Sequence, residues 1–259
     1  MIYDAREFAR VRNATLLVTA ASWALLLAGQ SGMIMFSHCP AASCGAMPFP
    51  ASLQMLLAMN PPASMAAGWA LMLAAMMLPV VISPLDYIRL RSFANRRVRS
   101  SALFLVGYFA VWMAAGSVLL AIEIVVKLLA PQSYLPAAAA VLIAVVWQVS
   151  PIKQRCLNRC CAYPVLAAFG GAADLDALHF GMTHGAWCAG SCWALMLAPM
   201  LLPQEHLLGM AIIALLIFSE RLEEPGPLCW RWRGCGRAVR IVIAQAQMRL
   251  QRNEMRLQR

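Results

Sequence analysis

Charged residues are scarce in this chain, and their scarcity excludes an ordinary soluble domain. Asp, Glu, Lys and Arg make up only 12% of the 259 residues, whereas a soluble domain carries about 25%. Hydrophobic residues account for 62%. This composition predicts an integral membrane protein of the all-α class, a polytopic helical bundle that is large enough for about six transmembrane helices.

Acidic residues are the rarer of the two charge types. The chain has 11 Asp and Glu residues against 21 Lys and Arg residues, which gives a formal net charge of +10. In a membrane protein such an excess is typical of cytoplasmic loops that lie near anionic lipid. We therefore expect the lipid bilayer to be the partner of the basic surface, and we expect no nucleic acid.

Several catalytic signatures are also missing. The sequence contains no phosphate-binding loop, no Ser-His-Asp order, no dinucleotide fingerprint and no haem-attachment motif. These absences remove the common nucleotide-dependent, hydrolytic and c-type haem functions. We therefore expect a protein that is not an enzyme.

Long apolar stretches dominate the remaining sequence. Those long enough to span a bilayer occupy residues 14–36, 63–85, 101–122, 128–152 and 183–203. The first has no clear small-residue cleavage site, so we expect it to be retained as a helix. A sixth stretch, 206–219, is short, and it could span only with local thinning of the bilayer or with Glu220 and Arg221 at the membrane interface. Residues 165–182 contain Asp174 and Asp176, which suggests an interfacial or re-entrant helix.

The basic residues predict the orientation. All of the 21 Lys and Arg residues except Lys127 fall in four regions that six spans place on one side. The positive-inside rule then puts both termini in the cytoplasm of a multi-pass protein of the bacterial inner membrane. We expect a transmembrane helical domain over residues 1–226 and a cytoplasmic basic tail over residues 227–259. Arginines at spacings of three and four make that tail a basic amphipathic helix.

Side chains that bind soft metals recur at every fourth residue of one apolar segment. HGAWCAGSCWALMLAPM carries His184, Cys188, Cys192, Met196 and Met200. Steps of four residues return to nearly the same face of an α-helix. Thiolate and thioether ligands favour Cu(I), with Zn(II) second because it prefers four ligands. Met and Cys also pack well in any core, so metal binding and plain packing both remain open.

A second group of ligand types lies in the loop 37–49, SHCPAASCGAMPF. His38, Cys39 and Cys44 are close together there, with Met47 nearby. On the oxidising side of the membrane, Cys39 and Cys44 are expected to form a disulfide in the metal-free protein. The alternatives are a copper-entry site and neither role.

The second apolar helix offers thioethers. Met72 and Met76 share one of its faces in WALMLAAMMLP. Such methionines serve either packing or copper ligation. Pro79 is expected to kink the helix or weaken its last turns.

Three cysteines lie in the basic loop 153–164, KQRCLNRCCAYP. Cys156, Cys160 and Cys161 face a reducing compartment in this topology, so a structural disulfide is not expected there. Their spacing does not match a zinc ribbon. A cytoplasmic metal-transfer site is the functional hypothesis for this loop.

Four blocks of the sequence together resemble a known family. They are WALMLAAMMLPVVISPL, WQVSPIKQRCLNRCCAYP, GMTHGAWCAGSCWALM and SERLEEPG. They are similar to motifs of the DUF2182 family, described as predicted metal-binding integral membrane proteins and sometimes labelled copper chaperones. The resemblance covers roughly residues 65–226 and implies metal ligation by His184, Cys188 and Cys192, with Met196 beside them. Ser191 stands where the family commonly has another cysteine.

Three functional hypotheses follow from the sequence. The first is a membrane protein that binds Cu(I) and holds it for, or passes it to, a membrane or periplasmic cuproprotein. The second is a non-catalytic accessory subunit of a larger membrane complex, in which Met, Cys and Trp serve helix packing. The third is a membrane thiol oxidoreductase that uses Cys39 with Cys44 and Cys188 with Cys192.

Overall fold

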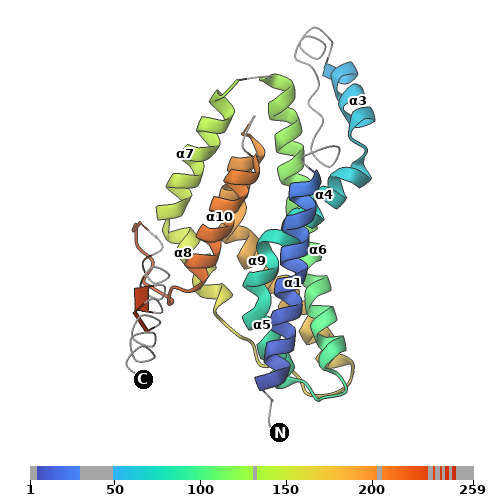
Figure 1. Ribbon diagram of the computed structural model, residues 1–259, viewed down its shortest axis with the longest axis vertical. Coiled ribbons are helices and arrows are strands. Elements are labelled where there is room, and N and C mark those ends of the chain that lie inside the picture. The colour runs from blue at the N-terminus through green and yellow to red at the C-terminus, as the bar shows by residue number, and fades with distance from the viewer. Residues whose placement is uncertain are drawn as a thin grey trace, which may run out of the picture.

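The computed structural model describes residues 5–29, 49–130, 133–202 and 206–232, together with positions 236, 240, 243, 244, 247 and 248. Within these residues the chain forms helices and no strands, so the all-α class is confirmed (Figure 1). In chain order the elements are α1 (Ala5–Gly29), α3 (Phe49–Met59), α4 (Pro62–Met77), η1 (Leu78–Val81), α5 (Ile82–Arg91), α6 (Arg97–Leu129), α7 (Leu135–Val149), α8 (Pro151–Cys160), α9 (Gly170–Met200) and α10 (His206–Arg221). His38, Cys39, Cys44 and Met47 lie outside the described residues.

Three helical stretches among the described residues are long and apolar enough to cross a membrane. They are Arg6–Gly29, Pro62–Arg91 and Arg97–Leu129. Helices α7 and α8 add a fourth if this pair, bent by 66°, is counted as one span. The expected number of six spans remains a prediction, as do the orientation and the compartment.

Pro79 breaks the second apolar stretch, as the sequence predicts. The chain passes from α4 into the single 3-10 turn η1 and then into α5. Proline lacks the N–H that would continue the α-helical ladder, and a 3-10 turn accommodates this loss. The α4 side of the break is tied to α1, because the Trp23 indole N–H donates to the Ala75 carbonyl at 3.0 Å.

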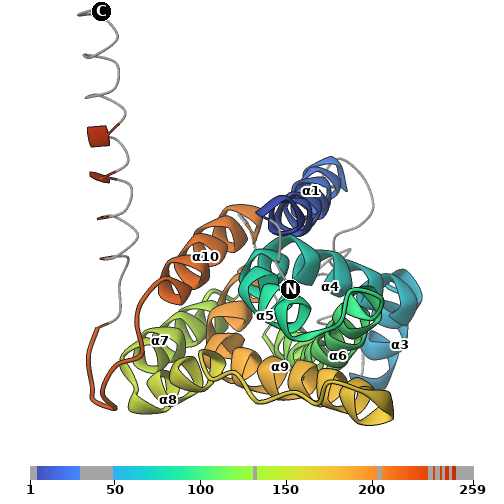
Figure 2. The ribbon, with the colours of Figure 1, turned by 90° about the horizontal axis from the view of Figure 1, so that it is seen from below.

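Among the described helices, α6 and α9 make the most extensive contact, and glycines allow their close approach. A Cβ atom on Gly181 would lie 2.1 Å from the Phe104 carbonyl oxygen, and one on Gly107 would lie 2.4 Å from the Leu178 carbonyl oxygen. Only glycine fits where two backbones come so close. The contact fixes one face of α9 against α6, and Figure 2 shows α9 running beneath α5 and α6.

The structure corrects the expected boundary before the fifth stretch. Residues 170–182 are not a separate interfacial or re-entrant helix; they form the first part of α9, a single helix of 31 residues. The two carboxylates that suggested a break both have partners in the folded chain. Asp174 pairs with Arg96 and Arg99, each at 2.6 Å, and Asp176 accepts the Ala167 N–H at 2.8 Å.

Much of the expected basic loop 153–164 is also helical. Ser150 ends α7 and caps α8, since its hydroxyl accepts the Lys153 backbone N–H at 3.1 Å. Pro151 occupies the first turn of α8, a favourable place for proline. The bend turns α8 against α9, so residues that the sequence places in a solvated loop become part of the helix packing.

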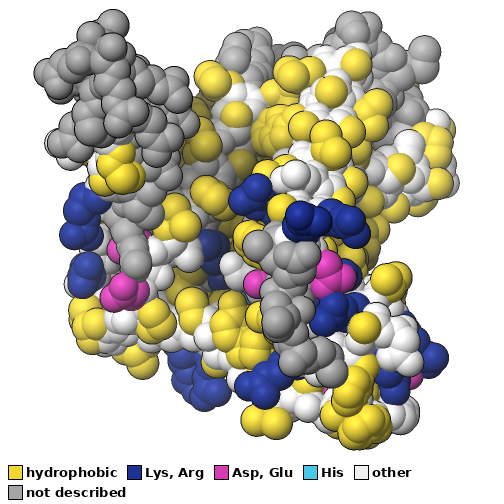
Figure 3. Space-filling view, turned by 60° about the horizontal axis from the view of Figure 1, so that its bottom comes forward, with side chains coloured by type: hydrophobic (Ala, Val, Ile, Leu, Met, Phe, Trp, Pro, Cys, Tyr) yellow, Lys and Arg dark blue, Asp and Glu magenta, His cyan; other side chains and the backbone are white. Residues whose placement is uncertain are grey.

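Basic side chains gather at the end of the bundle where α5 ends and α6 begins. Figure 3 views the molecule with this end turned forward and shows Lys and Arg side chains spread across it. Some of them are paired: Arg97 is hydrogen-bonded to Glu7 on α1, and Arg89 lies 3.8 Å from the same carboxylate. These pairs fasten the start of α1 to the α5–α6 corner.

Candidate functional site

The four-residue stripe of α9 faces the protein interior along its whole length. Cys188, Cys192 and Met196 have no exposed surface, and His184 and Met200 are 4% and 3% exposed. The shared helix face predicted from the spacing is therefore present. Burial alone is compatible with both packing and metal ligation. The polar contacts of each side chain are therefore needed to identify candidate metal ligands.

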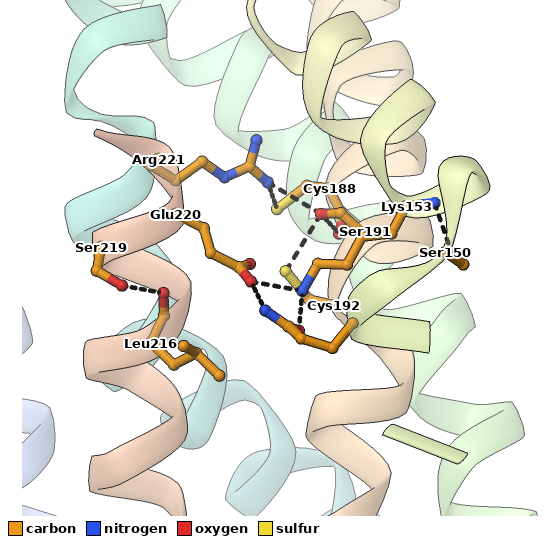
Figure 4. Close-up of polar contacts among 10 residues, drawn as sticks. Ser150, Lys153, Cys188, Ser191, Cys192, Leu216, Ser219, Glu220 and Arg221 are labelled. Carbon is orange, nitrogen blue, oxygen red and sulfur yellow. Dashed lines mark hydrogen bonds and ion pairs between the residues drawn. The ribbon is translucent and has the colours of Figure 1, made fainter. Parts of the chain in front are cut away.

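Cys188 and Cys192 form a thiol pair. Their side chains lie one helical turn apart on the same buried face of α9. The Ser191 hydroxyl donates to the Cys188 carbonyl at 2.8 Å and lies 3.3 Å from the Cys192 Sγ atom (Figure 4). From α6, the Tyr108 hydroxyl lies 3.3 Å from the Cys188 Sγ atom. Two sulfur atoms are thus held together in a buried, hydrogen-bonded setting.

A guanidinium group approaches the same pair from α10. The Arg221 Nη2 atom donates to the Cys188 Sγ atom at 3.1 Å and to the Ser191 hydroxyl at 3.3 Å (Figure 4). Cys160 on α8 lies close enough to this guanidinium to interact with its charge. The sequence offers Arg221 only as a residue of the membrane interface, and its contact with Cys188 was not predictable because the two residues are 33 positions apart in the chain.

The cysteines of α8 pack against the same part of α9. Cys156 and Cys160 are 6% and 3% exposed, while Cys161 is exposed. A Cβ atom on Gly190 would lie 3.1 Å from the Cys156 Sγ atom, so this glycine gives the α8 thiol room beside α9. Four buried cysteines therefore gather where α8 meets α9, two on each helix.

A second polar cluster lies next to the thiols. The Lys153 Nζ atom has no exposed surface and donates to Glu220 at 2.8 Å and to the Gln148 side-chain oxygen at 2.5 Å. Gln148 in turn donates to Glu220, and Figure 4 shows Lys153 directed at Glu220. Lys153 is therefore not a solvated charge of the basic loop, which corrects the expectation from the sequence. Its partners on α7 and α10 were not visible in local sequence pattern.

His184 lies within a ring of aromatic side chains. The ring centroids of Phe104, Tyr108 and Phe180 are 5.9 to 6.0 Å from the centroid of its imidazole. The His184 Nε2 atom is buried, and among the described residues it has no hydrogen-bond partner. An imidazole nitrogen with a free lone pair is a suitable metal ligand, and His184 lies one turn from Cys188.

The methionines of α4 are in the same core. Met72 and Met76 are 6% and 2% exposed and belong to the cluster that also contains Cys188, Cys192 and Met196. This placement suits packing and ligation equally. Among the described residues, no group of three or more His, Cys, Asp or Glu side chains is arranged to hold a metal ion. The thiol pair is therefore the best-defined soft-metal ligand set in this part of the chain.

A cavity of about 330 Å³ borders the thiol region between α8 and the segment that follows α10. Its wall includes Cys161, Asn158, Arg221, Glu223 and Arg231. Arg221 thus faces the cavity with one part of its side chain and the thiols with another. Arg221 therefore lies between the cavity and the buried thiol pair.

Comparison with known proteins gives one match. A family model described as PpoB2, copper chaperone, covers residues 66–244, which is well over half of the chain. No curated protein and no solved structure matches. The matched range contains the thiol pair, the α8 cysteines and Arg221. The sequence blocks that indicated a copper-handling family are therefore supported by a match to the whole region, and the chain belongs to the PpoB2 copper chaperone family.

Proposed function

We propose that this protein is an integral membrane protein that binds Cu(I) through Cys188 and Cys192 and passes it to a membrane or periplasmic cuproprotein. The observation that carries the proposal is the thiol pair itself. Two cysteines one turn apart on one face of α9 are buried, and the Cys188 Sγ atom lies 3.3 Å from the Tyr108 hydroxyl and 3.1 Å from the Arg221 guanidinium. Membership of a copper chaperone family supports copper as the cargo.

The coordination chemistry of the pair favours Cu(I) over Zn(II). A d¹⁰ Cu(I) ion is soft and is bound well by thiolate and thioether sulfur. A structural Zn(II) site almost always takes four ligands, and the described residues offer no such group. His184, through its unpartnered Nε2 atom, is the candidate third ligand toward one end of the pair. Met196, buried one turn beyond Cys192, is the candidate toward the other.

The membrane placement is part of the proposal. Six spans with both termini in the cytoplasm of a bacterial inner membrane would put the cavity wall and the exposed Cys161 on the cytoplasmic side. The exposed cysteines test this directly, because Cys161 and Cys229 are both accessible in the fold. In intact spheroplasts an impermeant thiol reagent should leave both unlabelled, and labelling after lysis should reach them. Labelling of Cys229 before lysis would contradict the six-span topology.

The main test is copper binding by the purified full-length protein. Wild type and Cys188→Ser/Cys192→Ser are prepared in detergent under reducing conditions with Cu(I) supplied. Wild type should hold a defined amount of copper per chain, and the double variant should lose it while retaining its helical content. The matched control is Cys161→Ser/Cys229→Ser, which removes two exposed thiols and should keep the copper.

Two outcomes would overturn the proposal. Full copper retention by Cys188→Ser/Cys192→Ser would place the metal elsewhere. Absence of copper from wild type under the same conditions would favour the accessory-subunit hypothesis, in which the stripe of α9 serves packing alone.

A further inference from the structure

A permanent positive charge lies directly against the proposed copper ligands. The guanidinium of Arg221 donates through Nη2 to the Cys188 Sγ atom at 3.1 Å. Its other hydrogen-bond partner among the described residues is the Ser191 hydroxyl at 3.3 Å. Its Nε atom is buried with no hydrogen-bond partner among the described residues. A thiol, rather than a carboxylate, is the group that this cation contacts most closely.

Arg221 forms no ion pair among the described residues, although Glu223 and Glu224 line the same cavity. Glu220, the adjacent residue, is turned to Lys153 and Gln148, at 2.8 Å from the Lys153 ammonium. Consecutive helical residues point about 100° apart, so Glu220 and Arg221 serve different neighbours. Lys153 and Glu220 together carry no net charge. The charge balance of the thiol site is therefore set by the thiols, Arg221 and whatever ion the thiols hold.

The charge of a metal–dithiolate depends on the metal. A Cu(I) ion with two thiolates carries a net charge of −1, whereas a Hg(II) ion with two thiolates is neutral. Both ions are soft and accept two sulfur ligands. A buried net charge is costly unless an opposite charge lies close to it. Arginine keeps its charge at any pH a protein meets, so Arg221 completes a neutral unit with the Cu(I) complex and leaves an excess positive charge beside the Hg(II) complex.

We infer that Arg221 is a positioning residue that compensates the charge of a bound monovalent soft ion and so makes the Cys188–Cys192 pair selective for Cu(I) over Hg(II). This inference rests on the proposed function, because it takes the two cysteines as the copper ligands. Arg221 acts through the charge it brings to the sulfur atoms and does not itself ligate the metal. The same geometry explains why a half-buried arginine is directed at sulfur with no carboxylate among its described partners.

The test compares two metals on the same variants. Cu(I) and Hg(II) affinities are measured by competition with soluble chelators on full-length protein in detergent. The Cys188→Ser/Cys192→Ser protein, measured in parallel, gives the contribution of the other thiols. Arg221→Met should weaken Cu(I) binding roughly 100-fold, the scale expected when a buried charge loses its partner, and should change Hg(II) binding by less than about tenfold. Arg221→Lys, which keeps the charge, should restore most of the Cu(I) preference.

The matched control is Arg231→Met. Arg231 is exposed and lines the same cavity, so this change removes one positive charge without touching the thiols, and the ratio of the two affinities should stay at the wild-type value. Equal losses of Cu(I) and Hg(II) affinity in Arg221→Met would leave the affinity ratio unchanged. That outcome would overturn the inference and assign Arg221 a structural role. If Arg221→Met does not fold, Arg221→Gln and Arg221→Lys give the same comparison of an uncharged and a charged side chain.

Failure of the inference is distinguishable from failure of the proposed function. If wild type binds Cu(I) and loses it in Cys188→Ser/Cys192→Ser while Arg221→Met keeps the wild-type ratio, only the role of Arg221 is wrong. If the double cysteine variant keeps its copper, the ligand assignment is wrong and the role of Arg221 falls with it.

Discussion

Glu220 and Arg221 are adjacent on α10, carry opposite charges and are used in opposite ways. Glu220 is 4% exposed, and its Oε1 atom accepts from both Lys153, which supplies the balancing charge, and Gln148. Arg221 has no carboxylate among its described partners and is directed at Cys188 and Ser191. Lys153 compensates the charge of Glu220 within the fold. The charge of Arg221 remains available to compensate negative charge at the thiols.

The two clusters differ in whether their charges are balanced within the fold. A buried ion pair that is complete in the folded chain leaves no charge for a ligand. A cation whose nearest contact is a thiol lowers the cost of negative charge on sulfur. Both clusters draw on α10, through Glu220 and Arg221, so their responses to mutation can be compared directly.

The largest expected effect comes from breaking the Lys153–Glu220 pair. Lys153→Met leaves the Glu220 carboxylate buried without its cation, and loss of one partner of a buried pair costs about 3–5 kcal/mol of unfolding free energy. Lys153→Met/Glu220→Leu removes both charges and should recover most of that loss. Thermal unfolding of the detergent-solubilised variants measures both. A double variant as unstable as the single one would show that the pair itself, and not an orphaned charge, stabilises the fold.

A smaller effect is expected from disturbing the α6–α9 pair, which carries Tyr108 and the two cysteines. Gly181→Ala places a Cβ atom against the Phe104 backbone, and such overpacking costs about 1–3 kcal/mol. Gly171→Ala is the matched control on the same helix, since a Cβ atom there meets nothing within 4 Å. It should leave the melting temperature unchanged or raise it slightly. Equal destabilisation by both variants would contradict the close approach of α6 and α9.

The stability of the metal-free Arg221→Met variant tests the same comparison at the thiol site. Removing this cation leaves no carboxylate uncompensated, because its described contacts are a thiol and a hydroxyl. The loss should be on the order of the hydrogen bonds removed, about 1–2 kcal/mol, and clearly below that of Lys153→Met. Unfolding of the two apo variants side by side checks the order. A loss as large as that of Lys153→Met would mean that Arg221 is compensated structurally after all.

The smallest effect is expected at Tyr108. Its hydroxyl contacts the Cys188 Sγ atom at 3.3 Å from the α6 side. Tyr108→Phe removes this contact and keeps the ring packing, so the unfolding free energy should fall by about 0.5–1.5 kcal/mol. The affinity for Cu(I) should change far less than in Arg221→Met, because a hydroxyl carries no net charge. A Cu(I) loss that matches Arg221→Met would assign the effect to geometry at Cys188 instead of charge.

The helices and the buried stripe of α9 were predictable, because both depend on local periodicity. The spacing of His184, Cys188 and Cys192 places them on one helix face, and the Pro79 break follows from the chemistry of proline. The charge pattern near the site was not predictable in the same way. Lys153 and Glu220 meet across 67 positions, so each looks like a solvated or interfacial residue until the fold joins them.

Asn158 joins distant segments in a way that bears on the dynamics of the chain. Its side-chain amide donates to the Gly226 carbonyl at 2.8 Å and accepts the Gly226 N–H at 3.2 Å. The Arg231 N–H then donates to the Val149 carbonyl at the α7–α8 bend. These three hydrogen bonds attach the irregular segment that follows α10 to α8 and to the end of α7. In hydrogen exchange, the amides of Gly226 and Arg231 should therefore open with the α8 unit, as slow-exchanging points in an otherwise unprotected stretch.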